Sequence, residues 1–440
     1  MKSSVMILYN LVAVLMCAVP AGHNYIDSNG SLSDVFVADS LENLYWEAVE
    51  ASDAGDDELA AALWLSAAEG GHVEAQYDYA LCLYNGLGVE QSDTAAFGWF
   101  LKAAVQGHAD AQFSAGYCSD NGIGTDLSHE KAVEWYWLAA DQGHADAQLA
   151  MGIHYYDARY GVLDYPLAVE WFGKAAAQGN PEAMSYMGNC HAEGNGVEKD
   201  DYKAFVWYSK GAEQEHAESV YNLAYCYDWG LGIDSNAGEA AKFYEQAAEL
   251  GLDIAQFDMA MYCLQEKDSL NALKWLEASA EQGYADALYI LGRFYYDGTI
   301  VERDYQKAVN NFALAAGQEH SDALCDLGYC YLTGRGVSRN AEIAVRWFLL
   351  SAKEENERAQ HNLGVCFYEG IGVEQSYTDA VAWFTLAAEK EYASSQYYLG
   401  VCYNNGYGVK TDRRMAVKLL RKAKVNGSEE AVEALRYLSE

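Results

Sequence analysis

Histidines with acidic neighbours are the residues of this chain whose spacing first suggests chemistry. His108-Ala109-Asp110 is one example, and such pairs would allow a metal site. The histidines share one column of a 36-residue period that has a single step of 32: His72, His108, His144, His216 and His320. The same column also holds Asn180, Leu252, Tyr284 and Ser428. Because the histidine is interchangeable with these residues, we expect turn residues and no metal or cofactor site.

Two further patterns could indicate catalysis or nucleotide binding. Gly86-x-Gly88 and its copies resemble phosphate loops, but they follow predicted helices where a nucleotide fold needs a strand. They are therefore predicted to end helices. Five residues break the period and are scattered over distant repeats: His129, His154, His191, His361 and Arg159. No nucleophile, base and orienting group stand out together, so the chain is predicted not to be an enzyme.

The period itself defines the elements that position these residues. An alanine recurs in every period, from Ala60 and Ala96 to Ala416, and such self-similarity is typical of stacked supersecondary units. Numbering the repeat from Val73, positions 24, 27, 28, 31 and 32 are apolar or small, which predicts an amphipathic helix, called helix B here. Position 20 is Ser, Asp or Asn throughout, and each N-cap contributes about 1 kcal/mol.

The first half of each repeat is predicted to form a second helix, called helix A, which ends at the glycines after it. Gly or Ala at position 8 would let helix B approach closely. An aromatic pair at positions 27 and 28 would then fill the space between the helices, so replacing Trp207 or Trp347 by Ala should cost about 3–5 kcal/mol.

These motifs resemble the Sel-1-like repeat, a relative of the tetratricopeptide repeat. The resemblance covers residues 37–440 and implies an all-α fold, a right-handed α/α superhelical solenoid. It gives a degenerate first unit over 37–72, full units beginning at 73, 109, 145, 181, 217, 253, 285, 321, 357 and 393, and a capping helix over 429–439. The unit 253–284 lacks four residues between its helices. Proteins of this kind look like interaction scaffolds, with no catalytic residues to carry over.

The N-terminus has the pattern of an export signal. Lys2 precedes an apolar run, and Val19-Pro20-Ala21 offers small residues for cleavage. We expect a signal peptide over 1–21, a flexible lead-in over 22–36, and an exported chain. In a bacterium the exported chain would be periplasmic or secreted. The alternatives are the endoplasmic reticulum lumen, if the chain is eukaryotic, and attachment to the membrane by an uncleaved signal.

The cysteines are predicted to be buried free thiols. Nine remain after residue 21, and seven of them recur at position 10 of helix A. Neighbouring helices lie about 8–10 Å apart, farther than the roughly 7 Å between the Cα atoms of a disulfide. Exported relatives of the resembled family have cysteines that join the two helices of a unit, but no helix B here contains one.

Positions 2, 5, 9 and 12 of helix A share the face that points away from positions 3, 7, 10 and 11, and we call this face the stripe. Aromatic residues are favoured at interface hot spots, so the stripe is predicted to bind a partner, although part of position 5 could instead pack against adjacent helices. The candidate residues are Tyr77, Tyr84, Asp110, Phe113, Tyr117, Asp146, Tyr156, Glu182, Glu218, Tyr221, Tyr225, Phe257, Asp286, Tyr289, Tyr296, Asp322, Tyr329 and Tyr368.

The net charge of the chain limits the classes of partner that it would attract. The formal net charge of −37 disfavours nucleic acids and anionic membranes and attracts a basic protein or peptide, although acidity could also serve solubility alone. The predicted function is a non-enzymatic scaffold that holds an extended or helical segment in an acidic, aromatic concave groove. The alternative is a ligand-binding protein or hydrolase for cell-wall or β-lactam-like compounds. The oligomeric state is left open.

Overall fold

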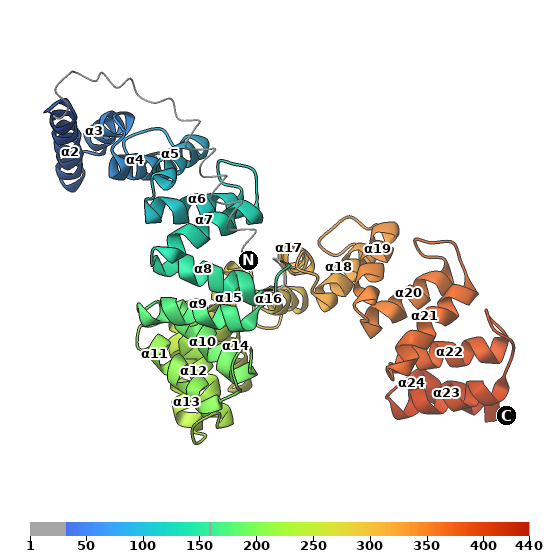
Figure 1. Cartoon of the computed structure of the whole chain (residues 1–440). Helices are drawn as coiled ribbons and strands as arrows, with labels where there is room; N and C mark the ends of the chain where they lie inside the picture. Colours follow the sequence, from blue (N-terminus) through green and yellow to red (C-terminus); the bar gives the residue numbers. More distant parts are fainter. Residues whose placement is uncertain (1–31, 158–160, 440) are drawn as a thin grey trace. The chain divides into compact units, whose positions relative to one another are not determined.

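The computed structural model describes residues 32–157 and 161–439, and the chain divides into two compact units, 1–240 and 241–440. Within the described ranges the only regular secondary structure is helical, as predicted (Figure 1). In each unit, helix A packs against helix B of its own repeat, and helix B packs against helix A of the next. The chain is therefore a helical-repeat solenoid.

Even-numbered labels are helices A and odd-numbered labels are helices B. The first unit contains α2 (Leu32–Asp53), α3 (Asp57–Glu69), α4 (Val73–Asn85), α5 (Asp93–Val105), α6 (Ala109–Asn121), α7 (His129–Asp141), α8 (Ala145–Tyr156), α9 (Tyr165–Ala177), α10 (Pro181–Glu193), α11 (Asp201–Ala212) and α12 (Ala217–Trp229). Helix α13 (Ala237–Glu249) crosses the boundary between the units.

The second unit continues with α14 (Asp253–Gln265), α15 (Ser269–Glu281), α16 (Ala285–Asp297), α17 (Tyr305–Ala316), α18 (Ser321–Thr333), α19 (Ala341–Lys353), α20 (Glu357–Glu369), α21 (Tyr377–Glu389), α22 (Ala393–Asn405), α23 (Arg413–Val425) and α24 (Glu429–Ser439). Only residues 266–268 connect α14 to α15, which agrees with the shortened loop expected there.

One boundary differs from the expectation. Helix α2 begins at Leu32, so residues 32–36 are helical and do not belong to a lead-in. The predicted signal peptide over 1–21 and the rest of the lead-in lie outside the described residues.

Side chains begin every helix B where the sequence predicted. The position-20 residues accept hydrogen bonds from backbone N–H groups of the first turn, as Ser92 does from Ala95 N and Asp200 from Lys203 N. At the other end, Gly86 ends α4 in the left-handed conformation. Gly88, at φ +68°, packs so tightly that a Cβ atom would lie 1.9 Å from the carbonyl oxygen of Asp57. Only glycine fits there.

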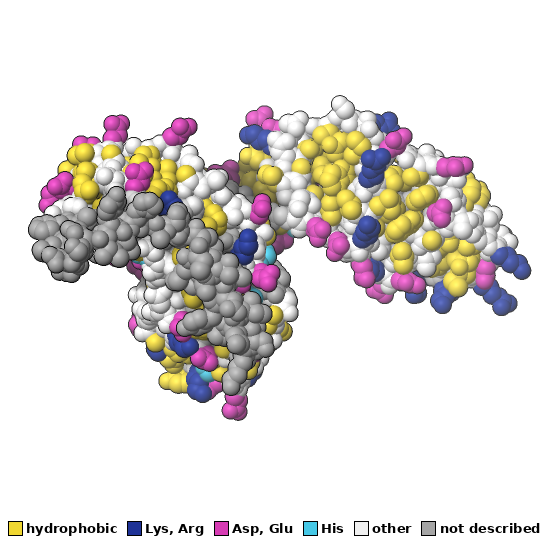
Figure 2. Space-filling model, turned by 45° about the horizontal axis from the view of Figure 1, so that its top comes forward, with side chains coloured by type: hydrophobic (Ala, Val, Ile, Leu, Met, Phe, Trp, Pro, Cys, Tyr) yellow, Lys and Arg dark blue, Asp and Glu magenta, His cyan; other side chains and the backbone are white. Residues whose placement is uncertain are grey.

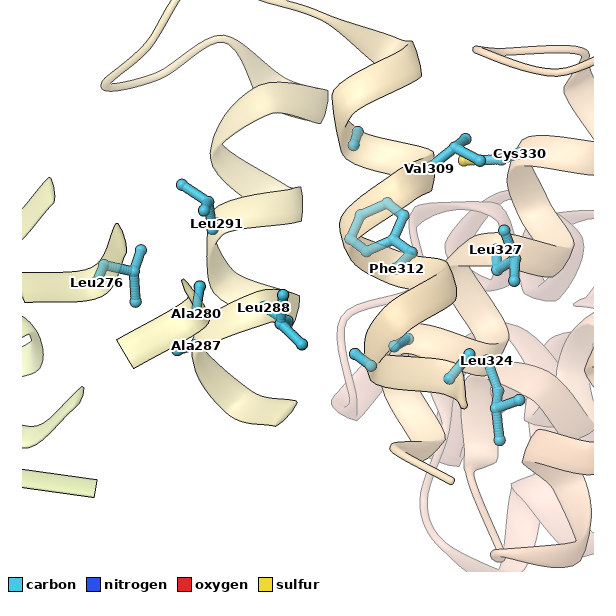
Figure 3. Packing of buried hydrophobic residues seen from close by; sticks show 14 of the residues in the cluster. Leu276, Ala280, Ala287, Leu288, Leu291, Val309, Phe312, Leu324, Leu327 and Cys330 are labelled. Atoms are coloured by element: carbon cyan, nitrogen blue, oxygen red, sulfur yellow. The ribbon is translucent and has the colours of Figure 1, made fainter. Parts of the chain in front are cut away.

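The core of each repeat forms where a small residue on helix A meets a large one on helix B. A Cβ atom added to Gly292 would lie 2.7 Å from the ring of Phe312, which is fully buried. Figure 3 shows Phe312 between Leu291 on α16 and Leu327 on α18. The position-8 glycine thus sets the distance between the two helices.

The expectation for position 27 is wrong in part. In most repeats the aromatic residue at position 28 is the buried one, as for Phe348, whereas Trp207 and Trp347 at position 27 are only half-buried. Trp171 is an exception, because it is buried at position 27. Lys210 Nζ lies 4.1 Å from the ring centroid of Trp207, which therefore covers the core from outside. Because the position-8 glycine faces position 28, the larger cavity would follow from loss of Phe348.

Glutamine pairs link successive repeats inside the first unit. Gln76 is buried at position 4, donates to the carbonyl oxygen of Ala68 on the preceding helix B, and accepts from Gln106 Nε2 at 2.7 Å. The pairs Gln112 with Gln142 and Gln148 with Gln178 repeat this geometry. Each buried amide is satisfied, so these pairs stabilise the stack without leaving an unpaired polar atom.

The nine cysteines of the described residues are buried and free, as predicted. Burial raises the pKa of the Cys190, Cys325 and Cys330 thiols to about 12. They pack as small apolar side chains. In the part of the chain that the structure describes, no helix is long and apolar enough to cross a membrane.

Candidate partner-binding surface

Three tyrosines of the stripe are exposed, and each lines a cavity. Tyr117 is 44% exposed, Tyr225 45% and Tyr329 39%. All three stand at position 9 of helix A, on α6, α12 and α18. The cavities at Tyr117 and Tyr225 lie within the first unit, and the cavity at Tyr329 lies within the second.

The cavity at Tyr117, called the acidic cavity here, has a volume of about 370 Å³. Its apolar lining includes Leu149 and Ile153 from α8. Carboxylates stand beside this apolar surface, and the full lining is Phe113, Tyr117, Asp120, Asn121, Val133, Tyr136, Asp146, Leu149, Ala150, Ile153, His154 and Glu182. The combination suits a side chain with an apolar stem and a positive end.

The surroundings of Glu182 in the acidic cavity disfavour its ionised form. Burial raises its pKa, and the negative charges of Glu218 and Asp146 raise it further. A positive group placed beside Glu182 would relieve both effects, because an opposite charge favours the ionised form.

Two of the period-breaking histidines are not scattered as expected. His154 lines the acidic cavity together with Asp120, and His129 Nδ1 lies 2.5 Å from Asp120 Oδ1. Repeat stacking brings them together because α6, α7 and α8 are consecutive. His361, by contrast, lies within the second unit, where burial lowers the pKa of its imidazole to about 4. His191 is also buried, and Arg159 lies outside the described residues.

The aromatic residues at position 5 pack between repeats, and Phe113 among them also lines the acidic cavity. Tyr77 stacks on His108 with ring centroids 4.7 Å apart, Phe113 on His144 at 4.8 Å and Tyr289 on His320 at 4.7 Å. Phe257 contacts Tyr284 at a tilted angle, with ring centroids 5.3 Å apart, and Tyr221 is half-buried. The stacked rings therefore contact the adjacent repeat, as the alternative for part of position 5 expects.

The histidine column caps helices, as the turn interpretation requires. His144 Nδ1 accepts from Ala147 N, and its Nε2 lies 3.1 Å from Asp110 Oδ1 of the preceding helix A. His320 contacts Asp286 likewise, and the caps Asn180 and Asn356 donate to Asp146 and Asp322. Four of the predicted acidic stripe residues thus hold neighbouring repeats together. The remaining two are Glu182 and Glu218.

The tyrosines at position 12 are half-buried and rest on the position-28 ring of their own repeat. The four are Tyr84, Tyr156, Tyr296 and Tyr368. The Tyr156 hydroxyl lies 3.2 Å from Glu193 Oε2, and the Tyr296 hydroxyl accepts from Arg335. Their rings therefore pack against the core, and only their hydroxyl groups extend toward the outer surface of the stripe.

The cavity at Tyr329, called the arginine cavity here, has a volume of about 230 Å³. Its lining is Arg293, Tyr296, Asp326, Tyr329, Arg358, Asn362 and Tyr392. Asp326 is 7% exposed and lies between the two guanidinium groups. Burial alone would lower the pKa of Arg358, but Asp326, Cys325 and Tyr289 together outweigh this and raise the pKa.

The residues that give the arginine cavity its charge, Arg293 and Arg358, are not among the predicted stripe residues. Arg293 replaces an aromatic or aliphatic residue at position 9, and Arg358 replaces an acid at position 2. A comparison of each stripe position across the repeats would have found both. In the described ranges, no three His, Cys, Asp or Glu residues are grouped so as to hold a metal ion.

Comparisons with known proteins agree with the repeat geometry. The Sel1 repeat model matches eleven segments, 52–72, 73–108, 109–144, 145–180, 181–216, 217–252, 253–284, 285–320, 321–356, 357–392 and 393–427. Sel1 repeat proteins generally mediate protein–protein interactions and are typically non-catalytic scaffolds. The search of curated proteins gave no match.

Two solved structures resemble the chain over long stretches. A protective antigen present in uropathogenic Escherichia coli strains, which displays an SLR fold, is 30% identical, with 91% of each chain covered and a TM-score of 0.55. A Sel1 repeat protein from Oxalobacter formigenes is 31% identical over 54% of this chain and 99% of its own, with a TM-score of 0.49. The family model covers most of the chain, and this protein belongs to the Sel1 repeat family.

Proposed function

We propose that this chain is a non-enzymatic docking scaffold whose helix-A surface binds a segment of a partner protein, and that the acidic cavity receives a lysine or arginine side chain of that segment. The observation that carries the proposal is that the exposed position-9 tyrosines all line cavities. An exposed aromatic ring beside a cavity supplies contact area at small entropic cost.

The acidic cavity supports a basic occupant. Leu149 and Ile153 offer apolar contact to the methylene groups of a lysine, and Asp120 and Glu182 stand at the same cavity. The excess of 65 acidic over 28 basic residues in the whole chain adds long-range attraction, which accelerates association and weakens with salt.

The test uses a fluorescein-labelled dodecapeptide of Lys-Leu-Ser repeats, blocked at both ends, and a counterpart with Gln for Lys. Anisotropy should show tighter binding of the Lys peptide by the full chain. Glu182→Arg should weaken that binding at least tenfold, and Tyr117→Ala about fivefold, since the first adds repulsion and the second removes contact.

Tyr202→Ala is the matched control, because Tyr202 is 63% exposed on α11 and lines none of the three cavities. It should leave binding unchanged. Equal affinity for the Lys and Gln peptides, or equal losses from Tyr117→Ala and Tyr202→Ala, would contradict the proposal.

We also propose that the chain is exported. Lys2 followed by the apolar run up to Ala21 supports this. N-terminal sequencing of protein recovered outside the cytoplasm should begin near Ala21, and a mature chain that starts at its first residues would exclude cleavage.

A further inference from the structure

Positive charge is concentrated in one part of the chain. Residues 1–240 contain 36 acidic and 8 basic residues, whereas residues 241–440 contain 29 and 20. Ten of the eleven arginines follow residue 240. In Figure 2, dark-blue side chains are visible over the part that Figure 1 colours orange to red. A site for a negatively charged group is therefore most readily built in the second unit.

The arginine cavity holds two of these side chains in fixed places. Arg293 Nη1 lies 3.3 Å from Asp326 Oδ2, and Arg358 Nη2 contacts the other carboxylate oxygen. Each guanidinium is also held from outside, Arg293 by Asp297 at 2.9 Å and Arg358 by Asp322 at 3.3 Å. Four carboxylate contacts thus fix the direction of both groups before any ligand arrives.

Both guanidinium groups keep hydrogen-bond capacity for a ligand. A guanidinium has five N–H donors, and the contacts with carboxylates use three in Arg293 and two in Arg358. Their side chains are 37% and 35% exposed, whereas Asp326 is buried. The surface offered to the cavity is therefore richer in donors than in acceptors.

A third arginine stands beside the same cavity. The guanidinium carbon of Arg335 lies 5.4 Å from the ring centroid of Tyr296 and 5.9 Å from that of Tyr329, both of which line the cavity. Arg335 also donates to the Tyr296 hydroxyl, and it forms no ion pair with a carboxylate of the described residues. Its positive charge is therefore not balanced by direct contact.

We propose that the arginine cavity binds the side-chain carboxylate of an aspartate or glutamate in a partner polypeptide. This rests on the docking function proposed above and adds a second site of opposite charge preference. Two anchored guanidinium groups can accept a carboxylate with several N–H···O bonds, and Arg335 adds attraction beside them. Tyr296, Tyr329 and Tyr392 supply ring surface for the adjoining peptide.

The test measures anisotropy with the full chain and a labelled dodecapeptide of Glu-Leu-Ser repeats, blocked at both ends so that only side-chain carboxylates are present. The matched peptide has Gln for Glu. We expect the Glu peptide to bind at least tenfold more tightly. Arg335→Gln, at an exposed position that can change without loss of the fold, should reduce this binding at least fivefold.

The control is the double variant Lys418→Gln, Lys422→Gln, which removes two exposed positive charges on α23 that do not line the cavity. It should leave Glu-peptide binding within twofold. An equal loss in this control and in Arg335→Gln would mean attraction by general charge, and equal binding of the Glu and Gln peptides would also overturn the proposal.

Competition separates a peptide site from a general anion site. Inorganic phosphate at concentrations that only screen charge should displace the Glu peptide no better than chloride of equal ionic strength. Displacement specific to phosphate would overturn the assignment to a carboxylate. If the Lys peptide still binds while the Glu peptide does not, this inference alone fails and the docking function stands.

Discussion

The acidic and arginine cavities share five equivalent lining residues, which occupy four positions of the repeat. Each takes positions 9 and 12 from one repeat, positions 6 and 9 from the next, and position 2 from the third. The equivalent pairs are Tyr117 and Arg293, Asp120 and Tyr296, Ala150 and Asp326, Ile153 and Tyr329, and Glu182 and Arg358. The backbone therefore provides one recess repeatedly, and a few substitutions decide which charge it accepts.

The two cavities also differ in how their charges are held. In the acidic cavity Asp146 is exposed and hydrogen-bonded to Asn180, whereas in the arginine cavity Asp326 is buried between Arg293 and Arg358. Removing a buried partner leaves other charges uncompensated, while removing an exposed one does not. The same type of substitution should therefore have unequal effects.

Asp326→Asn should produce the largest change in the free energy of unfolding. The free energy of unfolding of the second unit should fall by about 2 kcal/mol, below the 3–5 kcal/mol of a fully buried pair because the guanidinium groups are partly exposed. Hydrogen exchange of α18 amides in urea would measure it. Asp146→Asn is the control and should stay within about 0.5 kcal/mol; equal effects would remove the distinction between the cavities.

Lys390→Gln should raise the free energy of unfolding, by less than Asp326→Asn lowers it. Gln360 is buried in the second unit, and its Oε1 has no hydrogen-bond partner among the described residues, because Lys390 stands where Gln106 and Gln142 stand in the first unit. Lys390 instead reaches Glu355. A glutamine at 390 should restore the pair and stabilise the chain by about 1 kcal/mol.

Thermal unfolding of the Lys390→Gln variant followed by circular dichroism provides the measurement. Lys390→Met serves as control, since it removes the Glu355 contact without supplying an amide. Equal stability of the Gln and Met variants would show that the unpaired oxygen of Gln360 is not the cause.

The smallest expected effect is on pH dependence. Since the folded chain holds the Glu182 proton more tightly than the unfolded chain, this group favours folding below its ordinary pKa, and that contribution is lost as pH rises through the raised value. Binding of a lysine needs the ionised form and changes in the opposite direction. Lys-peptide affinity should therefore fall about twofold from pH 7 to pH 5.

Other groups near Glu182 require a control in that measurement. Asp120, Asp146, Glu218 and His154 also lie near it, and burial lowers the pKa of His154. Glu182→Gln should flatten the pH dependence of Lys-peptide binding between pH 5 and 7. An unchanged slope in that variant would assign the effect to another group. Binding at the arginine cavity should vary less over this range, because arginine stays charged.

The sequence predicted the features that depend on one repeat alone. Position-20 caps such as Ser92 and helix stops such as Gly86 were identified correctly because each acts on the backbone next to it. The exposure of a stripe residue depends on the following repeat. Tyr77 is half-buried because His108 stacks on it, and no spacing within its own helix indicates this.

Spacing also could not separate positions 27 and 28. Both lie on the apolar face of helix B, but Gly328 faces Phe348 across the helix pair, which leaves Trp347 at the edge. The charge of the second cavity escaped prediction for a related reason. Arg293 and Arg358 lie in different repeats, and only stacking places both against Asp326.

The nine buried thiols are distributed so that their reactivity can report the unfolding of individual repeats. Seven of them occupy the same place in seven different repeats: Cys82, Cys118, Cys190, Cys226, Cys330, Cys366 and Cys402. A thiol with a raised pKa that is shielded from solvent reacts slowly with alkylating reagents until its repeat unfolds. Brief alkylation followed by mass spectrometry would therefore reveal which repeats unfold first, without any engineered cysteine.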